Sequence, residues 1–352
     1  TMPGGSKITI VDVARAAGVS VATVSAVING RAREARISPE TVQKVLAVID
    51  DLEYQPHHLA QSLRRGSTQL IGLTVSSLHD PFYTQFCMTF GTICRANGYG
   101  MFLTDIVDWA DTKPAAVAGA RSSVDGVVTV DTRQSPWHAG GKVLNPSTSP
   151  IPTILVANQA LLAHWNQPLT ANTIVLQTEI CGQLAARHLF QRGCRRFAYI
   201  PQATAPEMFP GHRELGFCDE LAKLGVPADH VTLGPLRQSA YYSMNELIRD
   251  GWPGQGGRPA GVYVESDLGA MEVIRAVHEA GWRVPYDVAI IGTNGSPLGR
   301  MTLPPLTSVS LRVEWVAQEA ARLLLELVGG ITRSAQHPVL YVQPELVVRE
   351  SA

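Results

Sequence analysis

A short segment near the N-terminus gathers side chains that could bind an anionic partner. It holds three hydroxyl residues and, soon after them, three arginines, namely Ser20, Thr23, Ser25, Arg31, Arg33 and Arg36. Hydroxyl groups bind phosphates or cap helices, and the forked guanidinium group suits phosphate and groove contacts in nucleic acid. Helix caps for the hydroxyls and a solvated loop for the arginines are the alternatives. The pattern leaves both interpretations open.

Two short helices joined by a tight turn would hold these side chains over residues 9–29. Thr9 can cap the first helix, with Asp12 as its capping-box partner, and Gly18 can end it in the left-handed conformation. Ser20 then caps the second helix. The expected buried positions of the two helices are Ile10, Val13, Ala14, Ala17, Val24, Val27 and Ile28.

A third helix is expected to start at residues 38–40, where a cap, a first-turn proline and a first-turn acid follow one another. Its apolar face would be Val42, Val45, Leu46, Ile49 and Leu52. Three short helices can share one small core, and a helix, a glycine turn and a second helix place that second helix in a DNA major groove. Any other small three-helix domain is the alternative.

The rest of the chain alternates predicted strands and helices in two series. Strands are expected over 70–76, 100–105, 126–130 and 153–157, and then over 173–177, 196–201, 230–234, 261–265 and 288–292. Helices are expected near 82–97, 111–123, 179–192, 211–224, 239–250, 267–280 and 313–328. This alternation predicts an α/β fold with two doubly wound parallel sheets, and a ligand in the crevice at the carboxyl ends of the strands.

Composition narrows the class of protein. The 352 residues suffice for two or three domains, and no apolar run approaches the ~18 residues of a membrane span. The five cysteines, Cys87, Cys94, Cys181, Cys194 and Cys218, show no metal-ligand spacing, which fits reduced thiols. No secretion signal is visible. We therefore expect a cytoplasmic protein that needs no metal or cofactor and does not associate with a membrane.

The charge distribution and the absence of catalytic motifs favour a DNA-binding protein over an enzyme. Residues 1–66 carry eight Lys and Arg against six Asp and Glu, whereas the whole chain has a net charge of −1. A basic N-terminal segment joined to a slightly acidic body weakly favours DNA binding. Ser76, Ser77, His79 and Asp80 could be imagined as a catalytic triad, but the chain lacks a nucleophile elbow, a phosphate loop and a zinc motif. We expect no enzyme activity.

The sequence resembles the LacI-type, or lactose-repressor-like, family of bacterial transcriptional regulators. The resemblance runs in order along nearly the whole chain. It is carried by segments 12–30 (DVARAAGVSVATVSAVING), 37–56, 59–66 (LAQSLRRG), 70–83, 124–130, 185–200, 213–217 (RELGF), 266–292, 304–309 (PPLTSV) and 344–351. It implies a helix-turn-helix head over 1–56, a hinge helix over 57–67 and a periplasmic-binding-protein-like body. The first lobe would be 68–176 with 311–340 and would form the dimer, and the second would be 177–310 with 341–352.

The resemblance also assigns DNA contacts. The family's base-reading positions are Val21, Ala22 and Ala26, whose small apolar side chains can touch only a thymine methyl group. Base reading could therefore be weaker here, or shifted to the neighbouring hydroxyls. Asn29 matches a phosphate contact of the family, and Thr9 is also expected to contact DNA. In the hinge, Leu63 would wedge into the minor groove beside Ala60, with Arg64 against phosphates.

Seven residues match effector-binding positions of the family, namely Ser76, Asp80, Phe82, Asn158, Arg213, Ser266 and Asn294. Many relatives have aspartate where Asn294 stands and asparagine where Ser266 stands. The site thus keeps a cation and loses carboxylates, which favours a ligand that carries or tolerates negative charge. The resemblance implies a homodimeric repressor on near-palindromic operator DNA. Its affinity for the operator would be switched by a sugar, a sugar acid or a related metabolite. A small-molecule binding protein without a DNA role is the alternative.

Overall fold

The computed structural model describes residues 8–54, 67–105, 124–130, 149, 151–159, 172–201, 212–253, 259–331 and 339–352. The chain divides into two compact units, Thr1–Thr68 and Gln69–Ala352. The helix expected near 111–123 and the hinge residues 57–66 lie outside the described residues.

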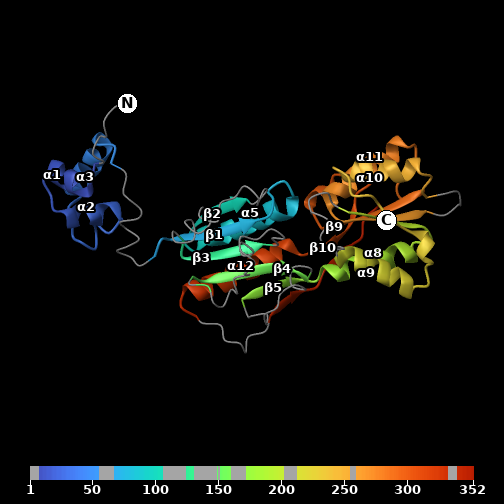
Figure 1. The fold of residues 1–352 in the computed structure, drawn as a ribbon. Coiled ribbons are helices and arrows are strands. Elements are labelled where there is room, and N and C mark those ends of the chain that lie inside the picture. The colour runs from blue at the N-terminus through green and yellow to red at the C-terminus, as the bar shows by residue number, and fades with distance from the viewer. Residues whose placement is uncertain are drawn as a thin grey trace, which may run out of the picture. The chain divides into compact units, whose positions relative to one another are not determined.

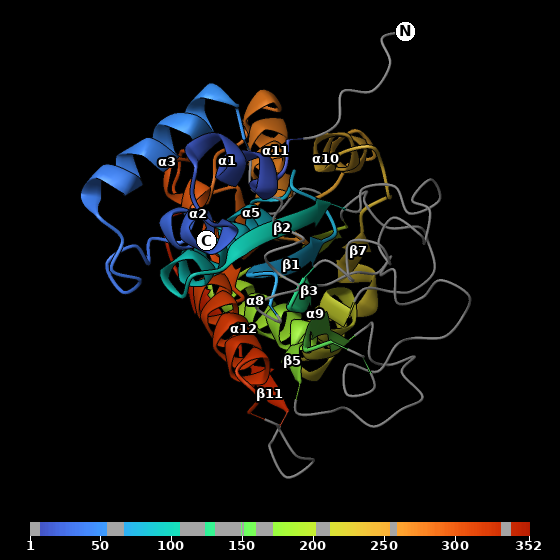
Figure 2. The same ribbon diagram turned by 90° about the vertical axis from the view of Figure 1, so that its left-hand side faces the viewer.

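The N-terminal unit has the three predicted helices, α1 (Ile10–Ala17), α2 (Val21–Ile28) and α3 (Pro39–Asp51), drawn in blue in Figures 1 and 2. The predicted capping box of α1 is present, because Asp12 Oδ2 accepts both the backbone N–H of Thr9 (3.0 Å) and its hydroxyl (2.6 Å). Gly18 ends α1 with a φ of 64°. The predicted caps of α2 and α3 also form, since Ser20 and Ser38 accept from the third residue beyond them.

One small core joins the three helices. Its buried members are Val13, Ala14, Ala17, Val24, Val27 and Val45. The expected apolar face of α3 is wrong at Leu46, which is 44% exposed. Val48 packs against the core instead. Leu46 follows Val45 by one residue, so the 100° step of the helix turns its side chain away from the core.

The first sheet of the body contains the described strands β1 (Leu70–Val75), β2 (Gly100–Asp105), β3 (Gly126–Val130), β4 (Thr153–Asn158), β5 (Thr173–Leu176) and β11 (Leu340–Val342). Their order is β11-β5-β4-β3-β1-β2, and each neighbouring pair is parallel. Helices α5 (Pro81–Ala96) and α12 (Val313–Val328) pack on each other and on these strands (Figure 1).

The second sheet contains β6 (Phe197–Ile200), β7 (Val231–Leu233), β8 (Ala260–Val264), β9 (Val288–Asn294), β10 (Thr307–Ser310) and β12 (Glu345–Val347). Their order is β12-β10-β9-β8-β6-β7, and only the β10–β12 pair is antiparallel. Figure 1 shows α8 (Thr178–Gln191) and α9 (His212–Lys223) on one side of this sheet, and α10 (Ala240–Arg249) and α11 (Asp267–Glu279) on the other. This is the expected doubly wound α/β arrangement.

The chain passes between the sheets three times. It leaves the first sheet after Leu176 and returns to it after Ser310, close to the expected positions. The last crossing differs from the expectation near residue 340. Strand β11 continues to Val342 beside β5, so the crossing falls at 343–344.

Cysteine pairing, metal-binding clusters and membrane-spanning helices can be assessed over the described residues. The five cysteines form no disulfide. Within the described ranges, no group of three His, Cys, Asp or Glu side chains could hold a metal ion. No single described helix is long and apolar enough to cross a membrane, although α1 and α2 pass that test jointly across a bend of 106°.

Candidate nucleic-acid interface and ligand site

The N-terminal end of α2 carries hydroxyls that are already committed to capping. Ser20 Oγ accepts the backbone N–H of Thr23 at 3.1 Å, and the two hydroxyl oxygens lie 2.9 Å apart. Because Val24 and Val27 are buried in the core and Val21 packs against it, the outer side of α2 carries polar and small residues. Ala22 is exposed there, and Thr23, Ser25 and Ala26 are partly exposed. The predicted capping role is confirmed, and DNA contact by this face stays a prediction.

Asn29 closes α2 at its other end. Its side-chain Nδ2 donates to the carbonyl oxygen of Ser25 at 2.6 Å, and a second contact reaches Ser25 Oγ at 3.4 Å. The amide is therefore oriented by its own helix before any partner arrives. A phosphate contact at Asn29, like one at Thr9 beside the capping box of α1, remains a prediction.

The arginine segment forms a compact turn. Ala35 N donates to the carbonyl of Arg31 at 3.0 Å, and Ile37 N donates to that of Ala32 at 2.9 Å. Ala32 and Ile37 pack against the core of the head. Arg36 takes a φ of 54° to close the turn. The three arginine side chains of this segment are consequently anchored at their backbones and exposed at their ends.

The three hinge candidates, Ala60, Leu63 and Arg64, lie outside the described residues. Their expected roles in the minor groove and at phosphates stay predictions.

In the body, Arg213 and Asn294 come together as expected. Arg213 lies in the first turn of α9, and its Nη2 donates to Asn294 Oδ1 at 3.4 Å. Its Nη1 donates to the backbone carbonyl of Glu265 at 2.6 Å, directly after β8. Asn294 ends β9 with a φ of 106°, a conformation that is strained for any residue except glycine. The guanidinium group therefore spans the carboxyl ends of two adjacent parallel strands.

Arg213 is buried against acidic and aromatic neighbours. Burial by itself would lower the pKa of its guanidinium group, but Tyr263 and Glu265 raise it, so the group stays charged. Tyr199, Phe217 and Tyr263 pack against one another as tilted rings, with centroids 5.3–6.4 Å apart. Among the described atoms, the Tyr199 hydroxyl and Arg213 Nε are buried without a hydrogen-bond partner. Such groups are available to a ligand.

Asp267 is a further residue of this region that the sequence did not single out. Its carboxylate accepts the backbone N–H of Ser296 and the hydroxyl of Ser308, both at 2.5 Å. Ser308 in turn accepts the backbone N–H of Gly295 at 3.0 Å. This network holds the turn after β9 and with it the strained backbone of Asn294. Its only sequence signal was the position of Asp267 in the first turn of α11.

Ser266 caps α11, because its Oγ accepts the backbone N–H of Gly269 at 3.1 Å. The side chain is 1% exposed. The hydroxyl hydrogen can still be donated, so contact with a ligand stays a prediction, but capping is the role that the structure gives to Ser266.

The other four candidates belong to the first sheet. Ser76 follows β1, and Asp80 caps α5 by accepting the backbone N–H of Phe82 at 2.8 Å. Phe82 and Asn158, at the end of β4, are each 4% exposed. Asp80 also acts electrostatically on Asp267. The candidates thus form two groups, each at the carboxyl ends of the strands of one sheet, where doubly wound folds bind ligands.

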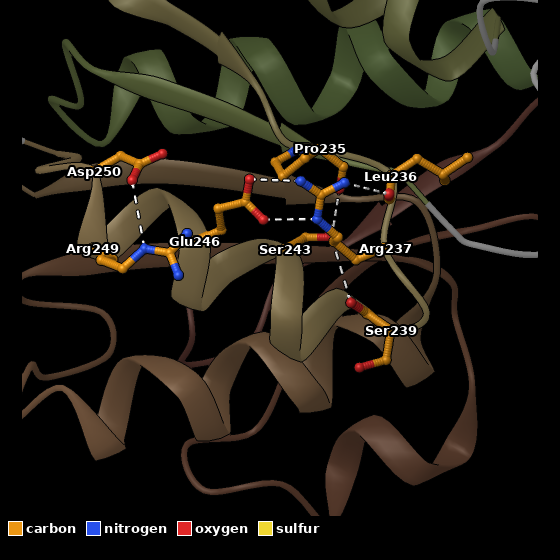
Figure 3. Close-up of polar contacts among 8 residues, drawn as sticks. All are labelled: Pro235, Leu236, Arg237, Ser239, Ser243, Glu246, Arg249 and Asp250. Atoms are coloured by element: carbon orange, nitrogen blue, oxygen red, sulfur yellow. Dashed lines mark hydrogen bonds and ion pairs between the residues drawn. The ribbon is translucent and has the colours of Figure 1, made fainter.

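The loop between β7 and α10 adjoins Tyr199. Gly234 N donates to the carbonyl of Tyr199 at 2.8 Å. Figure 3 shows how the loop is held: Arg237 makes two 2.7 Å hydrogen bonds to Glu246, and Ser243 Oγ donates to the carbonyl of Pro235 at 2.6 Å. Side-chain hydrogen bonds to α10 therefore hold the loop that contacts the backbone of Tyr199.

Comparison with known proteins agrees with this architecture. The sequence pattern of the lacI family of bacterial regulatory proteins matches residues 9–57, and that of the periplasmic binding protein-like domain matches residues 186–352. An HTH-type transcriptional repressor PurR of Pectobacterium atrosepticum is 31% identical over 349 residues, which are 97% of this chain and 96% of that protein.

Two solved structures are similar over the full length. The transcriptional regulator CelR in complex with cellobiose has 26% identity and a TM-score of 0.65, over 98% of this chain and all of the other. The lac repressor dimer bound to operator and an anti-inducer has 22% identity and a TM-score of 0.70, over 98% and 99% of the two chains. The relatives are transcriptional regulators and not enzymes, as the missing catalytic motifs led us to expect.

Proposed function

The chain belongs to the LacI family of bacterial regulatory proteins and is a DNA-binding transcriptional repressor with a ligand-binding domain, and we propose that a small polar metabolite switches its affinity for operator DNA. One observation carries the proposal. A helix-turn-helix unit shares one chain with a body in which polar side chains gather at the carboxyl ends of two parallel sheets.

On DNA, two copies of the chain bind one near-palindromic operator, each with one head. The outer side of α2 enters the major groove, where Val21, Ala22 and Ala26 touch bases and Ser20, Thr23, Ser25 and Asn29 lie near phosphates. Leu63 of the hinge enters the minor groove. The structure of the lac repressor dimer bound to operator supports this arrangement.

The effector binds between the two lobes of the body. The first lobe, 68–176 with 311–342, supplies Ser76, Asp80, Phe82 and Asn158, and the second, 177–310 with 343–352, supplies Arg213, Ser266 and Asn294. A sugar or a related polar metabolite suits these hydroxyl, amide and guanidinium groups. The CelR complex with cellobiose supports this class of ligand. The ligand shifts the balance between two arrangements of the lobes only by its different affinity for each.

Two measurements on the full chain and on a chain lacking residues 1–66 test the proposal. A thermal-shift screen against sugars, sugar acids and sugar phosphates finds ligands of the folded state, and fluorescence anisotropy measures binding to duplex DNA. We expect the shortened chain to keep ligand binding and to lose DNA binding. A full chain that binds ligands but no DNA would support the alternative of a small-molecule binding protein.

A further inference from the structure

Arg213, the cation of the proposed effector site, already has a buried counter-charge. Arg213 Nη1 lies 4.0 Å from Glu265 Oε1, and the two side chains are only 14% and 9% exposed. The same nitrogen donates to the backbone carbonyl of Glu265 at 2.6 Å. Because two opposite charges interact strongly when both are withdrawn from water, this guanidinium group is largely neutralised by its own protein.

A second carboxyl group lies close to this pair. Glu214 follows Arg213 in α9, and burial together with the charge of Glu265 raises the pKa of its carboxyl group. A ligand that reached Arg213 would therefore meet Glu214 and Glu265 as well. A carboxylate or phosphate would be repelled by the charge of Glu265, whereas a neutral hydroxyl group would not.

The Tyr199 hydroxyl is a group that a neutral ligand could bind. It is 1% exposed and has no hydrogen-bond partner among the described atoms. Arg213, Glu214 and Glu265 all act on it electrostatically, which places it within the same cluster. A neutral phenol can both donate to and accept from a ligand hydroxyl, so the unused capacity of the site suits uncharged polar groups.

We propose that Glu265 determines the charge preference of the effector site: by neutralising Arg213, it makes the site accept neutral polyhydroxyl ligands and reject their carboxylate and phosphate analogues. The proposal rests on the effector site of the proposed function. It reverses the preference for negative charge suggested by the sequence, where nothing indicated that Glu265 lies against Arg213.

The direct test is the variant Glu265→Gln, which keeps the side-chain shape and removes the charge. Inorganic phosphate and D-gluconate serve as anionic probes, at constant ionic strength with chloride as the reference, and calorimetry and melting temperature report saturable binding. We expect Glu265→Gln to bind both anions about tenfold more tightly than the natural chain, or better. The gain should disappear in the double variant Glu265→Gln, Arg213→Gln, because it depends on the guanidinium charge that Glu265 no longer neutralises.

Two further variants keep the test decisive. Glu279→Gln removes one carboxylate from another Arg–Glu pair of the same lobe, the exposed pair with Arg275 at 2.8 Å, and should change nothing. Glu214→Gln should give a smaller gain of the same sign, even if Glu265→Gln does not fold. Anion binding that is unchanged in the variants of both Glu214 and Glu265, or a gain that survives the loss of Arg213, overturns the proposal.

The anionic probes report on Arg213 without knowledge of the natural effector. A chain that binds no DNA, or that responds to no sugar, would count against the proposed function. The comparison of phosphate binding among the variants would still decide whether Glu265 masks Arg213. The two failures are therefore distinguishable.

Discussion

Gly182 of α8 and Gly216 of α9 face each other where the two helices touch backbone to backbone. A Cβ atom added to Gly182 would overlap the carbonyl oxygen of Arg213, and one added to Gly216 would overlap that of Glu179. No rotation of a side chain could relieve either overlap, since the obstructing atoms belong to the backbone. The crossing therefore fixes the first turn of α9, which carries Arg213.

Gly216→Ala should destabilise the body. Alanine is normally preferred over glycine in a helix by about 0.5–1 kcal/mol, but here the two helices must separate to admit the methyl group, which costs about 1–3 kcal/mol in well-packed cores. We expect a net loss at the upper end of that range, because backbone must move. Urea unfolding followed by tryptophan fluorescence measures it, since all six tryptophans lie beyond residue 66.

Gly91→Ala is the matched control for this substitution. Gly91 also lies inside a helix, α5, but a Cβ there would meet the end of the Met101 side chain at 3.3 Å. A methionine side chain can shift at little cost, so this variant should be neutral or slightly stabilising. Equal stability of the two variants would contradict the importance of the helix crossing.

The buried carboxylate of Asp267 should make stability depend on pH. Burial raises its pKa from 3.8 to about 7, although hydrogen bonds from Ser308 and Ser296 and the charge of Arg349 lower it. Between these two values the folded chain holds a proton that the unfolded chain releases. The free energy of unfolding should therefore fall as pH rises from about 4 to 7, and level off above 7. The contribution is at most roughly 4 kcal/mol.

Asp267→Asn tests this pH dependence. The amide oxygen can still accept from Ser296 N, and its NH₂ group can donate to Ser308 Oγ, so the network keeps its two contacts. We expect the variant to lose the fall between pH 4 and 7 and to become more stable than the natural chain near pH 8. Asp250→Asn, at a carboxylate that is 65% exposed, serves as the control. Parallel stability profiles for all three proteins would refute the role of Asp267.

DNA binding should depend less on salt when alanine replaces the three arginines of the turn, Arg31, Arg33 and Arg36. Each lost phosphate contact reduces the slope of log affinity against log salt by about 0.9 on duplex DNA. A mixed-sequence duplex suffices, because phosphate contacts need no operator. The control replaces Arg249, Arg275 and Arg283 of the body, whose side chains are 69–73% exposed. A slope unchanged by the first triple substitution would favour the solvated-turn interpretation.

Local features were predictable from the sequence, and long-range ones were not. The caps at Thr9, Ser20 and Ser38 depend on residues three positions away, so the sequence predicts them directly. The pairing of Arg213 with Glu265 spans 52 residues, and that of Asp267 with Ser308 spans 41. Such contacts arise only once parallel strands bring their carboxyl ends together. Consequently the sequence indicated Arg213 and Asn294 as neighbours in a candidate site but gave no sign of the Glu265 carboxylate beside them.

The N-cap of α2 offers a way to separate a structural role from a DNA contact. Ser20→Ala should cost about 1 kcal/mol of stability in the head, because the N–H of Thr23 loses its acceptor. Ser20→Asp keeps an acceptor there and adds a negative charge that suits a helix N-terminus. The protection of α1–α3 from amide hydrogen exchange should therefore return to that of the natural chain in Ser20→Asp, while binding to duplex DNA falls most at low salt.

Ser38→Asp makes the same change at the equivalent cap of α3, where Ser38 Oγ accepts from Thr41 N at 3.2 Å. Because both variants add one charge to the same small unit, a similar loss of DNA binding in the two would show only general repulsion. A loss confined to Ser20→Asp would place the start of α2 at the phosphates.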